Sequence, residues 1–253
     1  MGINTDTDVH QLVLANTRTF GTNKVNDLRV GYGYLKNAHI SPRANNVNVV
    51  KELGINLPSD NPLYWGVPNI GVTALSGLGE ESDAPFINDD KTIQIVDNFS
   101  WILGNHSMKF GGELRRVLYD QIGGVVTRGR FNFDGRYTRQ PLLPAAQRGG
   151  AAFADFLLGH MNNSESQVGA PIADFRSNYY AVYIQDNWKV TPNVTVDFGL
   201  RWEYDQPFTD VDDKIVNIDY VWDNSRAPVF VRTGTGDPYE DNPPFSLGSI
   251  PYV

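Results

Sequence analysis

Six segments of about a dozen residues alternate between apolar and polar positions, and they fall into three pairs separated by long polar stretches. A repeat of two residues is typical of a strand whose two faces meet different surroundings. Within each pair the connection has only three or four residues. The pattern therefore predicts three antiparallel hairpins, over residues 9–36, 91–121 and 179–205, with the long stretches 37–90, 122–178 and 206–253 as loops.

The last segment shows the alternation most clearly. Every even position from 194 to 204 is apolar, whereas the odd positions carry Thr195, Asp197, Gly199, Arg201 and Glu203. Strands of soluble proteins average five or six residues, whereas a tilted strand needs about nine to eleven residues to cross a bilayer. Short turns on one side and long loops on the other are typical of outer-membrane barrels. The expected fold is all-β, a segment of an antiparallel transmembrane β-barrel of about six strands, with short periplasmic turns and long extracellular loops.

Aromatic residues occur on the apolar side near both ends of the predicted strands, as in the girdles of membrane barrels. The residues predicted to face lipid or to form the girdles are Phe20, Tyr32, Tyr34, Trp101, Phe110, Trp188, Phe198, Trp202 and Tyr204. The same parity places Asp97 and Asp186 on this side. We expect both carboxylates to lie near the membrane interface or beside a β-bulge.

Charged residues occupy the opposite side of the same strands. Those predicted to face the barrel lumen are Asp27, Arg29, Lys109, Glu113, Arg115, Asp197, Arg201 and Glu203. We expect them to pair across strands and hold the register. Contact with a plug domain or with a substrate is the second interpretation.

The loops exceed the roughly 12 to 15 residues beyond which structureless connections are uncommon. A short helix is predicted over Ala151 to Leu158 and a strand extension over Gly129 to Asp134, whereas five prolines make residues 37–90 look irregular. The loop aromatics Tyr64, Trp65, Tyr220 and Trp222 could stack on a sugar or peptide, or could build a small loop core.

The composition argues against several functional classes for this protein. The 253-residue chain has a net charge of −8 and a sequence pI of about 4.9, which argues against nucleic acid as a partner. It has no cysteine, its four histidines lie far apart, and no catalytic motif is present. Two groups of loop carboxylates could hold calcium, although solvated acids are the simpler explanation: Asp83, Asp89 and Asp90, and Asp210, Asp212 and Asp213. We expect neither an enzyme nor a bound metal or cofactor.

Six strands are too few to close a barrel, for which eight is about the minimum. The first residues also lack the basic and apolar regions of a secretory signal. We therefore expect a fragment of a larger barrel.

The third hairpin carries a three-part motif. It reads Tyr183-Ile184-Gln185-Asp186-Asn187-Trp188, then Thr191-Pro192-Asn193, then Gly199-Leu200-Arg201-Trp202-Glu203. This combination resembles a barrel hairpin of TonB-dependent outer-membrane receptors. Three further stretches resemble the Oar-like branch, which carries a carboxypeptidase-regulatory-like domain: Phe99–Trp101, Gly104–Glu113 and Ala154–Gly159. The similarity covers most of residues 9 to 205.

The resemblance implies an outer-membrane receptor that binds a ligand at the cell surface and imports it with energy from the inner-membrane TonB complex. Its implied partners are outer-membrane lipid, the rest of the barrel with its plug, an extracellular ligand, and TonB through an N-terminal region. The family is expected to have a signal peptide, a TonB box, a plug and about 22 strands. Of these features, this sequence matches only part of the strands.

Two alternatives remain open from the sequence. One is a soluble β-sandwich acting as a carbohydrate-binding module, and the other is a structural or adhesin-type barrel. The sandwich predicts that Phe198, Leu200 and Trp202 are buried between two sheets, whereas a barrel predicts that they contact lipid.

Overall fold

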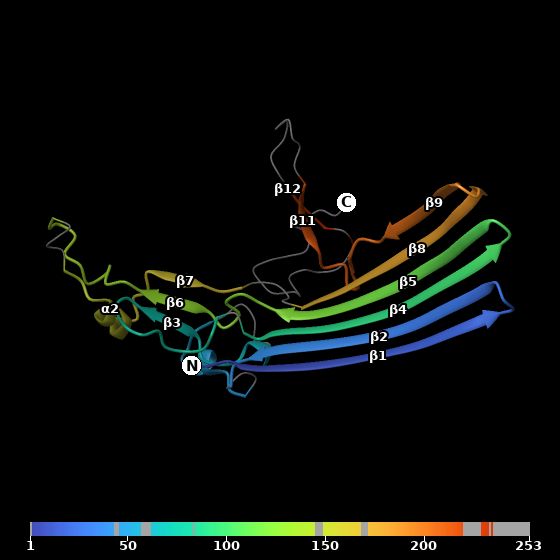
Figure 1. Cartoon of the computed structure of the whole chain (residues 1–253). Helices are drawn as coiled ribbons and strands as arrows, with labels where there is room; N and C mark the ends of the chain where they lie inside the picture. Colours follow the sequence, from blue (N-terminus) through green and yellow to red (C-terminus); the bar gives the residue numbers. More distant parts are fainter. Residues whose placement is uncertain are drawn as a thin grey trace.

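The computed structural model describes residues 2–42, 46–56, 62–82, 84–144, 149–167, 172–219, 229–232 and 234. Six long antiparallel strands form one curved sheet (Figure 1). A short strand, β10 (Thr209–Asp210), pairs with the start of β8. The six long strands, in order across the sheet, are β1 (Asn4–Phe20), β2 (Lys24–Ile40), β4 (Phe86–Leu103), β5 (His106–Gly123), β8 (Ile172–Thr191) and β9 (Val194–Asp205). The predicted fold class, an antiparallel barrel segment that is not closed, is confirmed.

The strands are staggered in the way that a barrel requires. One row of paired residues runs from Tyr32 through Ile93 and Arg116 to Asn178. It lies eight residues from Lys24 at the first turn, ten from Leu103 at the second and thirteen from Thr191 at the third. From the first turn to the third, four strands further on, the row climbs by five residues, or about 1.25 residues per strand. This corresponds to a strand tilt of about 40° at ~3.3 Å per residue and ~4.8 Å between strands. Strands of outer-membrane barrels tilt by about 35–45°.

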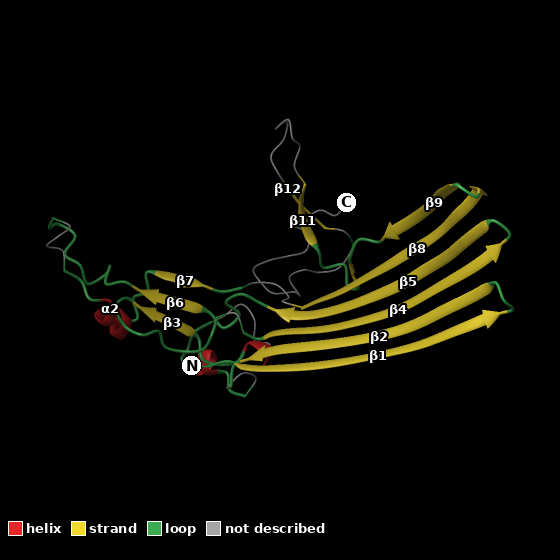
Figure 2. Ribbon diagram, viewed as in Figure 1, coloured by secondary structure: helices red, strands yellow, loops and turns green. Residues whose placement is uncertain are grey.

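The register places mostly apolar residues on one face of this sheet and mostly polar residues on the other. We call the side of Leu28, Ile95 and Leu200 the apolar face and the side of Arg29, Glu113 and Arg201 the polar face. On the apolar face Phe198, Leu200 and Trp202 are 57%, 72% and 55% exposed. No second sheet covers them in the described part of the chain (Figure 2). The sandwich alternative is therefore wrong.

The strands extend further toward the loops than the alternation predicts. β2 runs on to Ile40, β4 begins at Phe86 and β8 begins at Ile172. These extensions are polar or mixed on both sides. A strand that continues into water beyond the bilayer keeps its backbone pairing but no longer needs an apolar face, so alternation alone underestimates its length.

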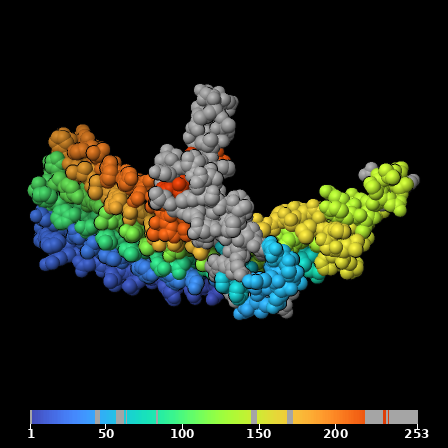
Figure 3. All heavy atoms as spheres, turned by 180° about the vertical axis from the view of Figure 1, so that it is seen from behind, coloured from blue at the N-terminus to red at the C-terminus, as the bar shows by residue number. Residues whose placement is uncertain are grey.

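The two long loops between the hairpins fold together into one small unit, which we call the loop subdomain. Its sheet consists of β3 (Asn69–Val72), β6 (Arg130–Phe133) and β7 (Asn163–Glu165); β3 and β6 are parallel, and β6 and β7 antiparallel. It projects from the end of the main sheet opposite the short turns (Figures 1 and 3). The remaining elements of these loops are α1 (Val49–Glu52), the 3-10 helix η1 (Pro62–Tyr64) and α2 (Ala152–Leu158).

A compact apolar core holds the loop subdomain together. Val72 from β3 and Phe131 and Phe133 from β6 are buried, and Phe156 of α2 packs edge-on against Phe133 with ring centroids 5.4 Å apart. The predicted helix is present. The segment 129–134 is a strand, but it pairs within the loop subdomain and does not extend the barrel, and residues 37–90 are more ordered than their prolines suggest.

Two buried ionised groups tie the loop segments to one another. Arg128 lies 3.6 Å from the buried Glu80 and donates from Nε to the Trp65 carbonyl at 3.0 Å. Burial lowers the pKa of Arg128, and Glu80 opposes that shift. Asp155 of α2 accepts the backbone N–H groups of Tyr137 and Thr138 at 3.1 and 3.0 Å. Burial by itself would raise the pKa of Asp155, but these hydrogen bonds bring it below its ordinary value.

Beyond the main sheet, β11 (Val216–Asp219) and β12 (Val229–Arg232) form a separate antiparallel pair. Within the described residues, no helix is both long and apolar enough to cross a membrane.

Phe133→Ala is expected to open the loop subdomain and leave the main sheet folded. Removing a buried phenylalanine costs about 3 kcal/mol, which is a large share of the stability of a unit this small. Pulsed proteolysis of the protein in membranes should then cleave within residues 129–165. The control is Leu142→Ala, at a residue that is 97% exposed. Equal protection of both variants would mean that this core does not hold the loops.

Acid is expected to loosen the contact between α2 and residues 137–138. Because the pKa of Asp155 is lower in the folded than in the unfolded protein, its contribution is complete above pH ~4 and is lost as the pH falls through the lower folded value. Hydrogen exchange of residues 134–140, corrected for intrinsic rates between pH 6 and pH 3, should speed up at the acid end. Asp155→Asn should show faster exchange at pH 6 and a flatter pH dependence.

Candidate functional site

All eight charged residues predicted for the lumen lie on the polar face. Through the intervening strands, the register joins Arg29 of β2 to Glu113 in β5 and Glu203 in β9, and it joins Asp27 of β2 to Arg201 in β9. Their pairing differs from the prediction, because the ion pairs form along a strand and not across strands. They are Arg29 with Asp27 at 2.9 Å, Arg115 with Glu113, and Arg201 with Glu203.

Side chains two residues apart on one strand share a face, and a long arginine bends back to reach its neighbour more easily than it spans to the next strand. Neutral side chains make the cross-strand connections instead. Gln94 donates to Glu113 at 2.8 Å, and Arg201 donates to the Tyr179 hydroxyl at 3.1 Å. Tyr183 donates to Asn98 at 2.8 Å. The result is a hydrated network that neutralises most of its own charge.

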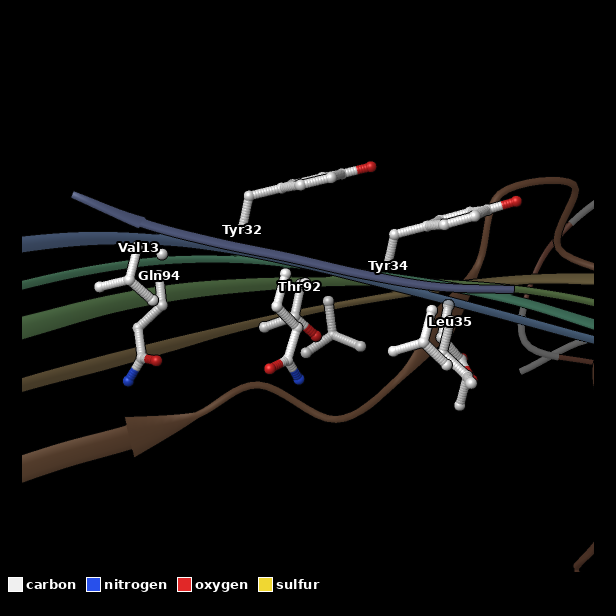
Figure 4. Close-up of a pocket in the computed structure, with 12 residues that line it drawn as sticks. Val13, Tyr32, Tyr34, Leu35, Thr92 and Gln94 are labelled. Carbon is white, nitrogen blue, oxygen red and sulfur yellow. The ribbon is translucent and has the colours of Figure 1, made fainter. Parts of the chain in front are cut away.

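A hollow of about 620 Å³ opens on the polar face (Figure 4). Figure 4 shows Val13, Leu35, Thr92 and Gln94 on one side of the strands, with Tyr32 and Tyr34 pointing to the other. Gly31 and Gly33 of β2 form its floor between β1 and β4. The remaining lining residues are Val9, Gln11, Asp90 and Val117.

The glycines of the wall have two different roles. A Cβ at Gly33 would meet no atom within 4 Å, so this glycine leaves space and relieves no crowding. Gly111 is the opposite case, because a Cβ there would lie 2.2 Å from the Tyr183 ring. Close packing against a glycine is thus found at Gly111, where the tyrosine crosses the strand, and not at Gly33.

The nine predicted girdle and lipid-facing aromatics all lie on the apolar face. They cluster at two levels, with Trp188 and Trp101 toward the turns and Tyr34 and Tyr204 toward the loops. On β8, Trp188 and Tyr180 are eight residues apart on this face, or about 20 Å along the membrane normal at the derived tilt. The apolar band of outer-membrane barrels is about 25 Å tall.

The two acidic residues that the sequence places on the aromatic side, Asp97 and Asp186, each have a hydrogen-bond partner. Asn26 donates to Asp97 at 2.7 Å, and His106 lies 2.6 Å from Asp186. Asp186 is two residues from Trp188 and Asp97 is four residues from Trp101, so both lie on the turn side of the sheet. That they lie near the membrane interface stays a prediction. The one register shift of the hairpin lies between Lys189 and Thr191 and adjoins neither carboxylate.

The structure describes two of the four loop aromatics, Tyr64 and Trp65. Tyr64 is buried, which supports the loop-core interpretation, and the Trp65 carbonyl accepts from Arg128. Tyr220 and Trp222 lie outside the described residues. Sequence reasoning missed the exposed side chains of α2, namely Phe153, Leu157 and Leu158 at 51%, 69% and 61% exposure. Their spacing around a seven-residue helix gave too short a pattern to separate an exposed side from a buried one.

Three of the loop carboxylates considered for calcium are bound to protein groups. Asp89 pairs with Lys91 at 2.8 Å, Asp212 pairs with Lys214 at 3.1 Å, and Asp210 accepts backbone N–H groups. Asp83 lies outside the described residues, and among those described no cluster of three or more metal-ligating side chains has suitable geometry.

Comparison with known proteins identifies the family. The family model described as an outer membrane beta barrel domain matches residues 1–245, which is nearly the whole chain. No curated protein and no solved structure gives a match. The match agrees with the stagger, the uncovered apolar face and the two aromatic levels. The chain therefore belongs to the outer membrane beta barrel domain family, and it is a protein of the outer membrane.

Proposed function

We propose that the chain is part of the wall of a TonB-dependent receptor of the Oar-like branch, which binds a ligand at the cell surface and imports it. The motif in the third hairpin is the sequence basis of this proposal. The polar face gives structural support to the proposal. A receptor of this kind needs a wide, hydrated lumen that a plug domain can occupy and from which the plug can move.

The observation that carries the proposal is the combination of self-paired charges and open space on the polar face. Charges that already pair along their own strands need no fixed partner across the lumen. A plug or a passing solute can then contact this wall without leaving a buried charge unpaired. The hollow above Gly31 and Gly33 provides room for such contact, and its lining offers amide, hydroxyl and carboxylate groups from Gln11, Gln94, Thr92 and Asp90.

The loop subdomain supplies the surface for first contact with a ligand. It stands at the end of the sheet away from the short turns, and its own core holds it in shape. Tyr137 and the α2 side chains Phe153, Leu157 and Leu158 are exposed there. Exposed aromatic and aliphatic groups on a rigid frame suit a ligand with an apolar part, such as a peptide.

The proposed partners follow from the two faces. Lipid of the outer membrane covers the apolar face, and a plug together with further strands completes the polar side. Coupling to TonB would act through a region N-terminal to the barrel. We propose no enzymatic activity, metal or cofactor for this chain.

Single-cysteine labelling should separate the two faces, and the absence of native cysteines gives a clean background. In proteoliposomes, a water-soluble maleimide should react with Arg201→Cys at least about tenfold faster than with Trp202→Cys, because only the first faces water. Glu203→Cys and Leu200→Cys form a matched second pair on the same strand. The reverse order of rates would contradict the assignment of lumen and lipid.

Filling the hollow should reduce import without unfolding the wall. Gly33→Leu meets no steric barrier at Cβ and places four carbons where solute would pass, so we expect several-fold slower uptake. The assay measures which compounds disappear from a complex medium in cells with the wild-type protein, with the variant, and without functional TonB. Val30→Leu, on the apolar face of the same strand, is the control.

The same assay tests the alternative of a structural or adhesin-type barrel. For a transporter, at least one compound should depend on both the protein and TonB. If depletion of the medium is identical in all strains while the protein is present in the outer membrane, the import function is wrong and the adhesin alternative is favoured.

A further inference from the structure

Two cations lie over aromatic rings at the turn end of the apolar face. The Arg18 guanidinium of β1 is 4.9 Å from the centre of the Phe20 ring, and the Lys24 ammonium of β2 is 4.9 Å from the centre of the Trp101 ring. The register places Phe20 opposite Lys24 and Lys24 opposite Trp101. These four residues therefore form one continuous group over three strands, which we call the basic patch.

Within the described part of the chain, neither Arg18 nor Lys24 has a carboxylate partner in an ion pair. At the loop end of the same face two cations do have acid partners, because Lys91 pairs with Asp89 and Arg176 pairs with Asp120. Asp97, an acid of the apolar face two strands from Arg18, takes its hydrogen bond from Asn26 instead. The basic patch therefore carries two positive charges that no acid of the described residues balances.

The location of the basic patch indicates which kind of anion could balance its two positive charges. It lies at the level of the turn-side aromatics, where the apolar band meets the lipid headgroups. Above it on the same face, Leu14, Leu28 and Val30 are exposed at 64%, 37% and 38% and present an apolar surface to acyl chains. A partner that combines a negative head with apolar tails matches both parts, whereas a free ion or a soluble protein matches only one.

We propose that the basic patch binds the phosphate of an anionic phospholipid in the leaflet on the side of the short turns. Arg18 pairs with Asn26 and Phe20 with Lys24, so Arg18 and Lys24 are diagonal neighbours with side-chain origins roughly 7 Å apart. Two long cationic side chains at that spacing can reach two oxygens of one phosphate. The rings of Phe20 and Trp101 support the apolar stems of the cations and hold their charged ends at the height of the headgroup.

The test uses the delipidated protein in detergent, titrated with phosphatidylglycerol or with phosphatidylcholine and measured by native mass spectrometry. Both lipids carry a phosphate, but only the first has a net negative charge. Two basic side chains near a membrane surface are expected to favour the anionic lipid by an order of magnitude or so. Arg18→Gln combined with Lys24→Gln should remove that preference.

Lys109→Gln combined with Lys189→Gln is the matched control. These lysines lie near the second and third short turns, at the same end of the sheet but on the polar face, so the control removes equal charge and should keep the preference. A heat-induced shift in gel mobility verifies that each variant is folded. The proposal is overturned if the wild type shows no preference, if the Arg18 and Lys24 variant keeps it, or if the control loses it equally.

Inorganic phosphate added in excess distinguishes the lipid from a free anion. It should not displace phosphatidylglycerol, because the acyl chains contribute to binding; displacement would mean a simple anion site and would also overturn the proposal. The inference depends on lipid covering the apolar face, which the labelling of Arg201→Cys and Trp202→Cys tests separately. It does not depend on import, so failure of one proposal leaves the other intact.

Discussion

Backbone hydrogen bonding between neighbouring strands is the interaction on which the rest of this structure depends. Within a bilayer no water is present to satisfy the peptide groups, so each strand must pair with the next along its whole length. From β1 through β5 to β8 the pairing continues without a register shift. Because a slip of one residue would exchange the two faces, this continuity keeps the aromatics on one side and the charged residues on the other.

The consequences differ at the two ends of the strands. Toward the short turns the apolar face carries Arg18 and Lys24 over aromatic rings without acid partners, whereas toward the loops Lys91 and Arg176 of the same face are paired with acids. The two ends of one face thus present different charge to the two leaflets. Beyond the loop end of the sheet, strand pairing no longer constrains the chain. The long loops fold there as a small soluble domain does, with an aromatic core and with Arg128 and Asp155 buried.

The polar face combines a stable wall with freedom to contact changing partners. Ion pairs along a strand, as between Arg201 and Glu203, leave each strand close to neutral. Tyrosine and glutamine side chains then connect the strands without fixing a charge in the lumen. Gly33 opens space and Gly111 admits the Tyr183 ring, so neighbouring glycines of one wall serve opposite purposes.

The sequence by itself determined the strands, their two faces and the three hairpins, because an alternation of two residues and a short turn are local properties. It also determined that Phe198 and Arg201 lie on opposite faces. Only the tertiary structure decided which hairpins are adjacent, how far β2 and β8 extend into water, and that Glu113 pairs with Arg115 of its own strand. The sequence also could not predict that the two long loops fold into one subdomain. β3 and β6 pair across some sixty residues of chain, and each strand has too few apolar positions to form a recognisable pattern by itself.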